Sequence, residues 1–120
     1  MSASRHLRGL CQVDVEVRCL KRPVHSGQKG GAVPDPVQIL CRLIADLRVK
    51  DGSSLTVIAF ESHPILGSAN QILDSARARI AVHTAPGMDL REAGQLLIRK
   101  LTRNSPHGAR VQARISRRRQ

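Results

Sequence analysis

The feature that most constrains the fold is the stretch 11–19, in which apolar and polar side chains alternate without a fault. A period of two residues is that of a β-strand with one face buried and the other in water. The apolar positions are Cys11, Val13, Val15, Val17 and Cys19, and the polar positions are Gln12, Asp14, Glu16 and Arg18. The chain should therefore form a sheet with one wet face and a second layer over the dry one.

Two stretches with helical spacing can supply that layer. Asp35 is a good N-cap and Pro36 suits the first helical position, whereas the turn residues at 51–54 predict an end near Lys50. Asp89 and Glu92 have the spacing of a capping box at the start of a second helix. The stripes that we expect to be buried are Val37, Leu40, Cys41, Ile44 and Leu47 in the first helix and Leu90, Ala93, Leu97 and Leu101 in the second.

Three further strands are predicted from residue type and alternation. Residues 55–60 (LTVIAF) are apolar and β-branched, and residues 76–83 and 109–115 alternate apolar with largely basic side chains. Residues 20–34 contain three glycines and predict a loop. The order βαββαβ predicts an α+β protein, a ferredoxin-like two-layer sandwich whose four-stranded antiparallel sheet has two helices on one face.

The second of these strands, residues 55–60, should lie at an edge of the sheet, because the first and third strands are central in this topology. Its sequence has no Lys or Pro and shows no sign of a bulge, which are the usual protections of an edge. We therefore expect two copies to pair antiparallel through this strand. The interface residues would be Leu55, Val57, Ile58 and Phe60.

Length and charge set broader limits. The 120 residues fit one domain, with a flexible N-terminal segment at 1–10, the domain at 11–116 and a basic tail at 117–120. The net charge of +11 would attract phosphate backbones or an acidic surface, although much of the excess lies at the two ends. No apolar run is long enough for a membrane span, and the first residues lack a secretory apolar region. The cytoplasm is the expected location.

The potential metal ligands are scattered. Cys11, Cys19 and Cys41 lack the spacing of a zinc or redox motif, so we expect small buried hydrophobes at all three positions. His6, His63 and His107 have no partners at ligand spacing. No cofactor or metal site is expected in this chain.

Two longer segments carry a resemblance. HSGQKGGAVPDPVQIL at 25–40 and GSANQILDSARARI at 67–80 resemble the dimerisation, or lid, domain of the aminoacylase, carnosinase and glutamate carboxypeptidase family of zinc metallopeptidases (the peptidase M20 dimerisation domain). The resemblance covers roughly residues 12–115. It implies a homodimer, and a lid that is normally inserted within a catalytic domain holding two zinc ions.

The resemblance also implies roles for three residues. His25 matches the lid histidine that reaches into the neighbouring subunit's active site to bind the substrate oxygen, and Asn70 matches a substrate-contacting asparagine. His83 stands where relatives commonly have an arginine for the substrate carboxylate. The join between residues 50 and 55 is shorter than usual in this branch of the family.

The sequence has no HxD-type segment and no adjacent pair of glutamates to hold the two zinc ions. The resemblance thus leads to part of a hydrolase, and we expect no hydrolysis by this chain alone. Its partners would be a second copy and possibly a separate catalytic-domain chain, with no membrane.

Two alternatives stay open. The fold also supports basic nucleic-acid-binding modules, but these stack bases on aromatic side chains, and the first and third strands have none. The chain could also be a truncated gene remnant without a function.

Overall fold

The structure is a computed structural model. It describes residues 9–19, 24–25, 35–48, 54–68, 71–103, 105–106 and 108–119. Its elements, in order, are β1 (Leu10–Cys19), β2 (Val24–His25), α1 (Pro36–Ala45), β3 (Ser54–Glu61), β4 (Gln71–Ile72), β5 (Ser75–His83), α2 (Leu90–Thr102) and β6 (Ala109–Arg119).

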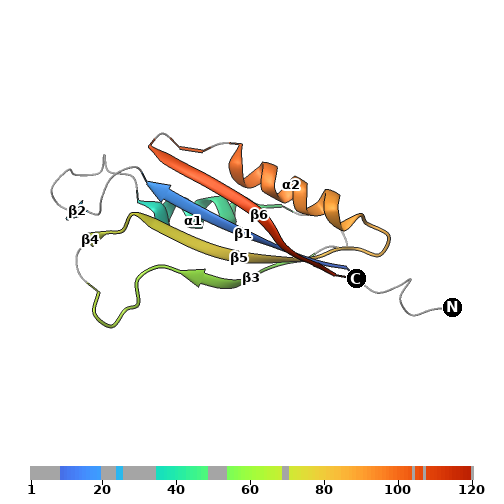
Figure 1. The fold of residues 1–120 in the computed structure, drawn as a ribbon, viewed down its shortest axis with the longest axis horizontal. Coiled ribbons are helices and arrows are strands. Elements are labelled where there is room, and N and C mark those ends of the chain that lie inside the picture. Colours follow the sequence, from blue (N-terminus) through green and yellow to red (C-terminus); the bar gives the residue numbers. More distant parts are fainter. Residues whose placement is uncertain are drawn as a thin grey trace.

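The main sheet is antiparallel and has the strand order β3-β5-β1-β6 (Figure 1). The predicted βαββαβ order and the α+β two-layer arrangement are confirmed, with β1 and β5 in the centre and β3 and β6 at the edges. A second, two-stranded ladder of β2 and β4 was not predicted. It falls where glycines predicted a loop, because two residues are too few to show a period.

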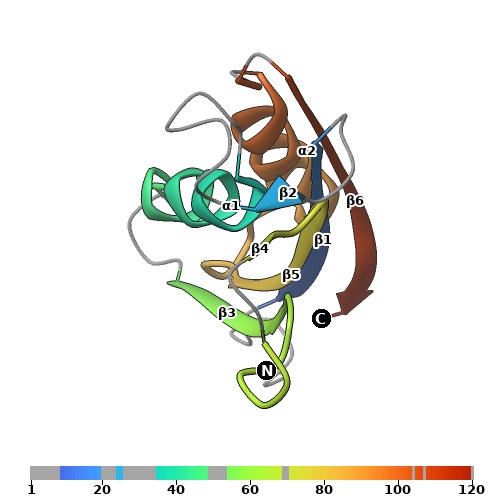
Figure 2. The same ribbon diagram turned by 90° about the vertical axis from the view of Figure 1, so that its left-hand side faces the viewer.

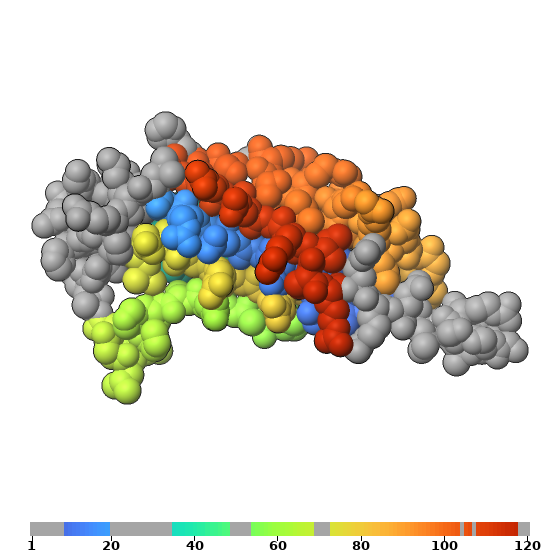
Figure 3. Space-filling view, in the orientation of Figure 1, coloured from blue at the N-terminus to red at the C-terminus, as the bar shows by residue number. Residues whose placement is uncertain are grey.

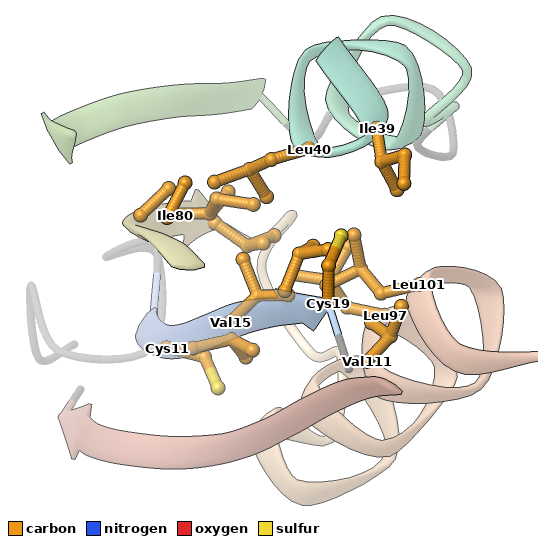
Figure 4. Close-up of a cluster of buried hydrophobic side chains, with 14 residues drawn as sticks. Cys11, Val15, Cys19, Ile39, Leu40, Ile80, Leu97, Leu101 and Val111 are labelled. Carbon is orange, nitrogen blue, oxygen red and sulfur yellow. The ribbon is translucent and has the colours of Figure 1, made fainter. Parts of the chain in front are cut away.

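The two helices cover one face of the sheet (Figure 2). Helix α1 packs over β1 and β5, and α2 packs over β1 and β6. The core between them is formed by apolar side chains, of which Leu40, Ile80 and Leu101 are the largest that are fully buried (Figure 4). The buried cluster comprises Cys11, Val13, Val15, Val17, Cys19, Ile39, Leu40, Ala76, Ala78, Ile80, Val82, Leu97, Leu101 and Val111.

Both helices begin where predicted. The Asp35 carboxylate accepts a hydrogen bond of 3.0 Å from the Val37 amide, and the Asp89 carboxylate accepts one of 2.8 Å from the Arg91 amide. Helix α2 ends at Thr102. Helix α1, however, ends at Ala45, before the predicted end near Lys50. The Arg48 side chain donates to the carbonyl oxygens of Ala45 and Leu47, and so satisfies acceptors that a longer helix would have used.

The prediction that all three cysteines are buried is wrong for one of them. Cys11 and Cys19 are buried, but Cys41 is exposed. The dry stripe of α1 passes through Ile39 and Leu40, and the next residue is turned by about 100° away from it. Burial raises the pKa of the Cys19 thiol above its ordinary value.

Candidate functional site

The edge strand β3 combines exposed apolar side chains with an open backbone edge. Val57 pairs with Ile80 and Phe60 with Ala78, so both lie in register with buried residues of β5. Each nevertheless keeps 40% of its surface exposed. The reason is that α1 packs over β1 and β5 and stops short of β3.

A register shift between Val57 and Ala59 makes Ile58 the extra residue of a bulge. The expectation that this edge carries no bulge is therefore wrong. A one-residue bulge leaves no mark in an uninterrupted run of apolar residues. Ile58 is 47% exposed, and with Val57 and Phe60 it forms an apolar strip, called here the β3 strip. The strand forms the lower margin of the molecule in Figure 3. Leu55 is partly buried and packs on the core.

The first predicted substrate-binding residue lies at one end of the molecule. His25 pairs with Gln71 in the β2–β4 ladder, which places its backbone beside the residue that follows Asn70. Asn70 itself and the side chain of His25 lie outside the described part of the chain. The β2–β4 ladder therefore brings these two stretches of sequence together.

Strand β5 ends at the opposite end of the molecule (Figure 1). Its last residue, His83, pairs with Leu10 and with Ser54. Leu10 also pairs with Arg119, so the chain enters β1 and leaves β6 at this same end. His83 is half-buried and is separated from His25 by the length of the sheet.

The outer face of the sheet carries a ladder of ion pairs over a shallow depression of about 660 Å³. Arg79 donates two hydrogen bonds to Asp14, and these bonds hold the pKa of that carboxyl below its usual value against an opposing effect of burial. The other pairs are Arg77 with Glu61 and Arg18 with Glu16. These pairs were not predicted, although the alternation of polar residues placed their members on one face.

The β6 edge differs from the β3 edge in its chemistry. Arg110, Arg114 and Arg117 are exposed on this strand. The acids of the outer face, Asp14, Glu16 and Glu61, are already paired with other arginines. Among the described residues, the three arginines of β6 therefore have no ion-pair partner. The strand also continues through Arg119, beyond the predicted end at Ile115, with a register shift near its end.

The described residues contain neither a cluster of metal ligands nor a membrane-spanning helix. None of their His, Cys, Asp and Glu side chains form a group of three or more that could hold a metal ion. Neither α1 nor α2 has the length and apolar character needed to cross a membrane.

Comparisons with known proteins agree on one relationship. The family model described as "Peptidase dimerisation domain" matches residues 5–109. A cysteinylglycine-S-conjugate dipeptidase of Corynebacterium striatum is 26% identical over 161 residues, which cover 92% of this chain and 35% of the relative. That span exceeds the 120 residues present here, so the relative has residues within it that lack a counterpart.

Solved structures show the same fold at lower identity. Human carnosine dipeptidase 1 superposes with a TM-score of 0.76 at 16% identity, covering 93% of this chain and 36% of that one. The di-peptidase Dug1p of Saccharomyces cerevisiae superposes with a TM-score of 0.74 at 14% identity, covering 95% and 36%. The chain thus spans about a third of the length of the relatives it matches.

Proposed function

This chain belongs to the peptidase dimerisation domain family. On that premise we propose that it is a homodimerisation and lid domain. By itself, it would not hydrolyse peptide or amide bonds. The observation that carries the proposal is the β3 strip, in which Val57, Ile58 and Phe60 are each at least 40% exposed beside an unpaired strand edge. Large apolar side chains along such an edge favour the addition of another strand.

A second copy can cover both the exposed apolar side chains of β3 and its unpaired backbone edge. Antiparallel pairing of β3 with its counterpart closes the backbone edge by two-fold symmetry. It also brings the first helix of each copy towards the other's β3, because α1 lies on the same face of the sheet as Val57 and Phe60. The helices can then cover the side chains that α1 leaves open within one chain.

The two ends of the sheet fit two different neighbours. The entry to β1 and the exit from β6 lie beside His83, so a catalytic domain continuous with this lid would sit at that end. His25 lies at the far end and would serve an active site of another subunit. His83 in place of the usual arginine would weaken recognition of a substrate carboxylate, because an imidazole lacks the planar pair of donors with which a guanidinium binds both carboxylate oxygens.

The zinc ions in this proposal belong to a catalytic domain, either in a longer protein or in a separate chain. We place this assembly in the cytoplasm. The additional residues of the Corynebacterium striatum relative are consistent with the short join between residues 50 and 55 that the resemblance indicates.

The alternative of a nucleic-acid-binding module is less well supported. Phe60 is the only aromatic residue of the chain, and it pairs with Ala78 in register with the helix-covered face. The open outer face therefore offers no aromatic platform for bases.

Sedimentation of the purified chain tests the proposal. We expect a dimer at tens of micromolar, and a folded monomer for Val57→Lys, because a charge within the β3 strip would be buried on pairing. Gln112→Lys is the matched control, since it adds the same charge on the other edge strand and should leave the dimer intact. A monomeric wild type, or a Val57→Lys variant that still dimerises, would refute pairing through β3.

A further inference from the structure

The most exposed apolar side chains lie outside the β3 strip. Ile65 and Leu66 are 93% and 92% exposed and are adjacent in sequence. Single exposed aliphatic residues are common, but two neighbours that leave almost all their surface in water contribute nothing to the packing of this chain. Their surface is therefore available to another molecule.

The backbone holds the two side chains in a defined turn. The Ser68 amide donates a hydrogen bond of 3.1 Å to the Ile65 carbonyl oxygen, which closes a four-residue turn. Gly67 occupies its third position with φ of +84°, a conformation that favours glycine. The turn is thus a formed structure that presents Ile65 and Leu66 at its start.

The position of this turn indicates what it meets. It belongs to the loop that follows β3, and both ribbon views show this loop projecting past β3 on the side away from β5 (Figures 1 and 2). That is the side on which a second copy would add its own β3. The loop therefore extends into the space that the second copy would occupy.

We propose that the Ile65–Leu66 turn is a second part of the dimer interface and docks against the partner copy beside the end of its first helix. The proposal rests on the pairing through β3 proposed above. In antiparallel two-fold pairing, the residues after Glu61 in one copy run alongside those before Ser54 in the other. The last described residues before that segment in the sequence are Leu47 and Arg48, which directly follow α1 and its cap.

The chemistry of that region suits two aliphatic side chains. Leu43 and Ile44 lie in the last turn of α1, Leu47 follows the helix, and all three are only partly buried. The turn would cover the apolar surface that these residues retain. A lipid surface is a poorer match, because residues 62–68 contain no Lys or Arg to attract anionic headgroups.

The first experiment measures self-association of the double variant Ile65→Ser/Leu66→Ser by sedimentation over a dilution series. We expect the dissociation constant of the dimer to be at least tenfold higher than that of the wild type. The circular dichroism spectrum and the melting temperature of the monomer should be unchanged. His63→Ser is the matched control, because His63 is an exposed residue of the same loop. It should dimerise as the wild type does.

A photocrosslinker on Leu66→Cys, in a Cys41→Ser background, gives a second and more direct readout. Mixed isotope-labelled and unlabelled copies should yield crosslinks between chains, to a peptide that contains Leu43, Ile44 and Leu47. Crosslinks confined to one chain would refute the docking.

The outcomes separate this inference from the proposed function. If Val57→Lys is monomeric but the double variant dimerises like the wild type, pairing through β3 stands and the docking of the turn is wrong. If the wild type is monomeric, both are wrong. If the double variant fails to fold, the two residues support the fold of the single chain, which also overturns the inference.

Discussion

Asp14 and Arg79, which are 65 positions apart in the sequence, meet side by side on the outer face through two hydrogen bonds of 2.7 and 2.9 Å. The two residues are direct cross-strand partners of β1 and β5. A bidentate pair has a stricter geometry than a single contact, so it favours the observed register of the two central strands. A slip by one residue would separate the pair and also turn the apolar face of β1 towards water.

The Asp14–Arg79 pair makes stability depend on acid. The folded-state pKa of Asp14 is lowered, mainly by its hydrogen bonds from Arg79, so its contribution is present above the ordinary value near 3.8 and is lost as the pH falls through the folded pKa. Asp14→Asn should therefore be modestly less stable than the wild type at pH 7, and the difference should vanish at low pH. Urea melts between low pH and pH 7 test this prediction. The control is Glu61→Gln, which removes the acid of the more exposed Glu61–Arg77 pair. A difference that persisted unchanged in acid would contradict the assignment.

Thr84 carries a buried hydroxyl that lacks a hydrogen-bond partner among the described residues. Such a group costs free energy because it loses its hydrogen bonds to water without replacement. Thr84→Val should raise the free energy of unfolding by about 1 kcal/mol, whereas Thr84→Ser, which keeps the hydroxyl and loses the methyl group, should lower it by about the same amount. Thermal melts of both variants decide the point, and a destabilised valine variant would mean that the hydroxyl is satisfied in solution.

Gly94 lies where α2 packs tightly against side chains of β1 and β6. A Cβ atom at this position would be 2.6 Å from Ile115 Cδ1 and 2.9 Å from Cys11 Sγ. Alanine gains about 1 kcal/mol of helix propensity over glycine, but overpacking of this kind costs about 1–3 kcal/mol. Gly94→Ala should therefore be destabilised on balance, whereas Gln95→Ala, an exposed change on the same helix, should be close to neutral. Ile115→Val removes the nearest clashing atom and should reduce the cost in a double-mutant cycle measured by urea melts.

Metal content provides a test that does not depend on dimerisation. Elemental analysis of the purified chain should find no stoichiometric zinc, and the chain should not cleave dipeptides or acylated amino acids, because its described residues offer no cluster of ligands. About two tightly held zinc ions per chain would overturn the proposal that the catalytic site lies elsewhere.

His25→Ala should leave folding and self-association unchanged.

The sequence predicted the parts of the fold that a repeated pattern encodes. The alternation from Cys11 to Cys19 gave the central strand and its dry face, and the capping residues Asp35 and Asp89 marked both helix starts. These signals are local, and each is supported by several residues or by a specific hydrogen bond.

Features that depend on single residues or on distant partners could not be predicted. The bulge at Ile58 depends on how β3 meets β5, and the early end of α1 depends on where the Arg48 side chain lies. At the site, the resemblance indicated His25, Asn70 and His83, but only the strand ladders place the first and last of them at opposite ends of the sheet. The exposure of Ile65 and Leu66 also could not be predicted, because a loop has no repeating pattern that separates buried from exposed side chains.

The unlike edges of the sheet have a consequence for the size of any assembly. Joining two copies through β3 leaves a β6 strand on each outer flank, and both flanks carry Arg110, Arg114 and Arg117. Two such flanks repel one another, and neither is complementary to an apolar β3 strip. If two copies pair through β3 as proposed, growth of the sheet would therefore stop after one round of association. The assembly would then be a closed particle of defined mass and not a fibre that lengthens with concentration.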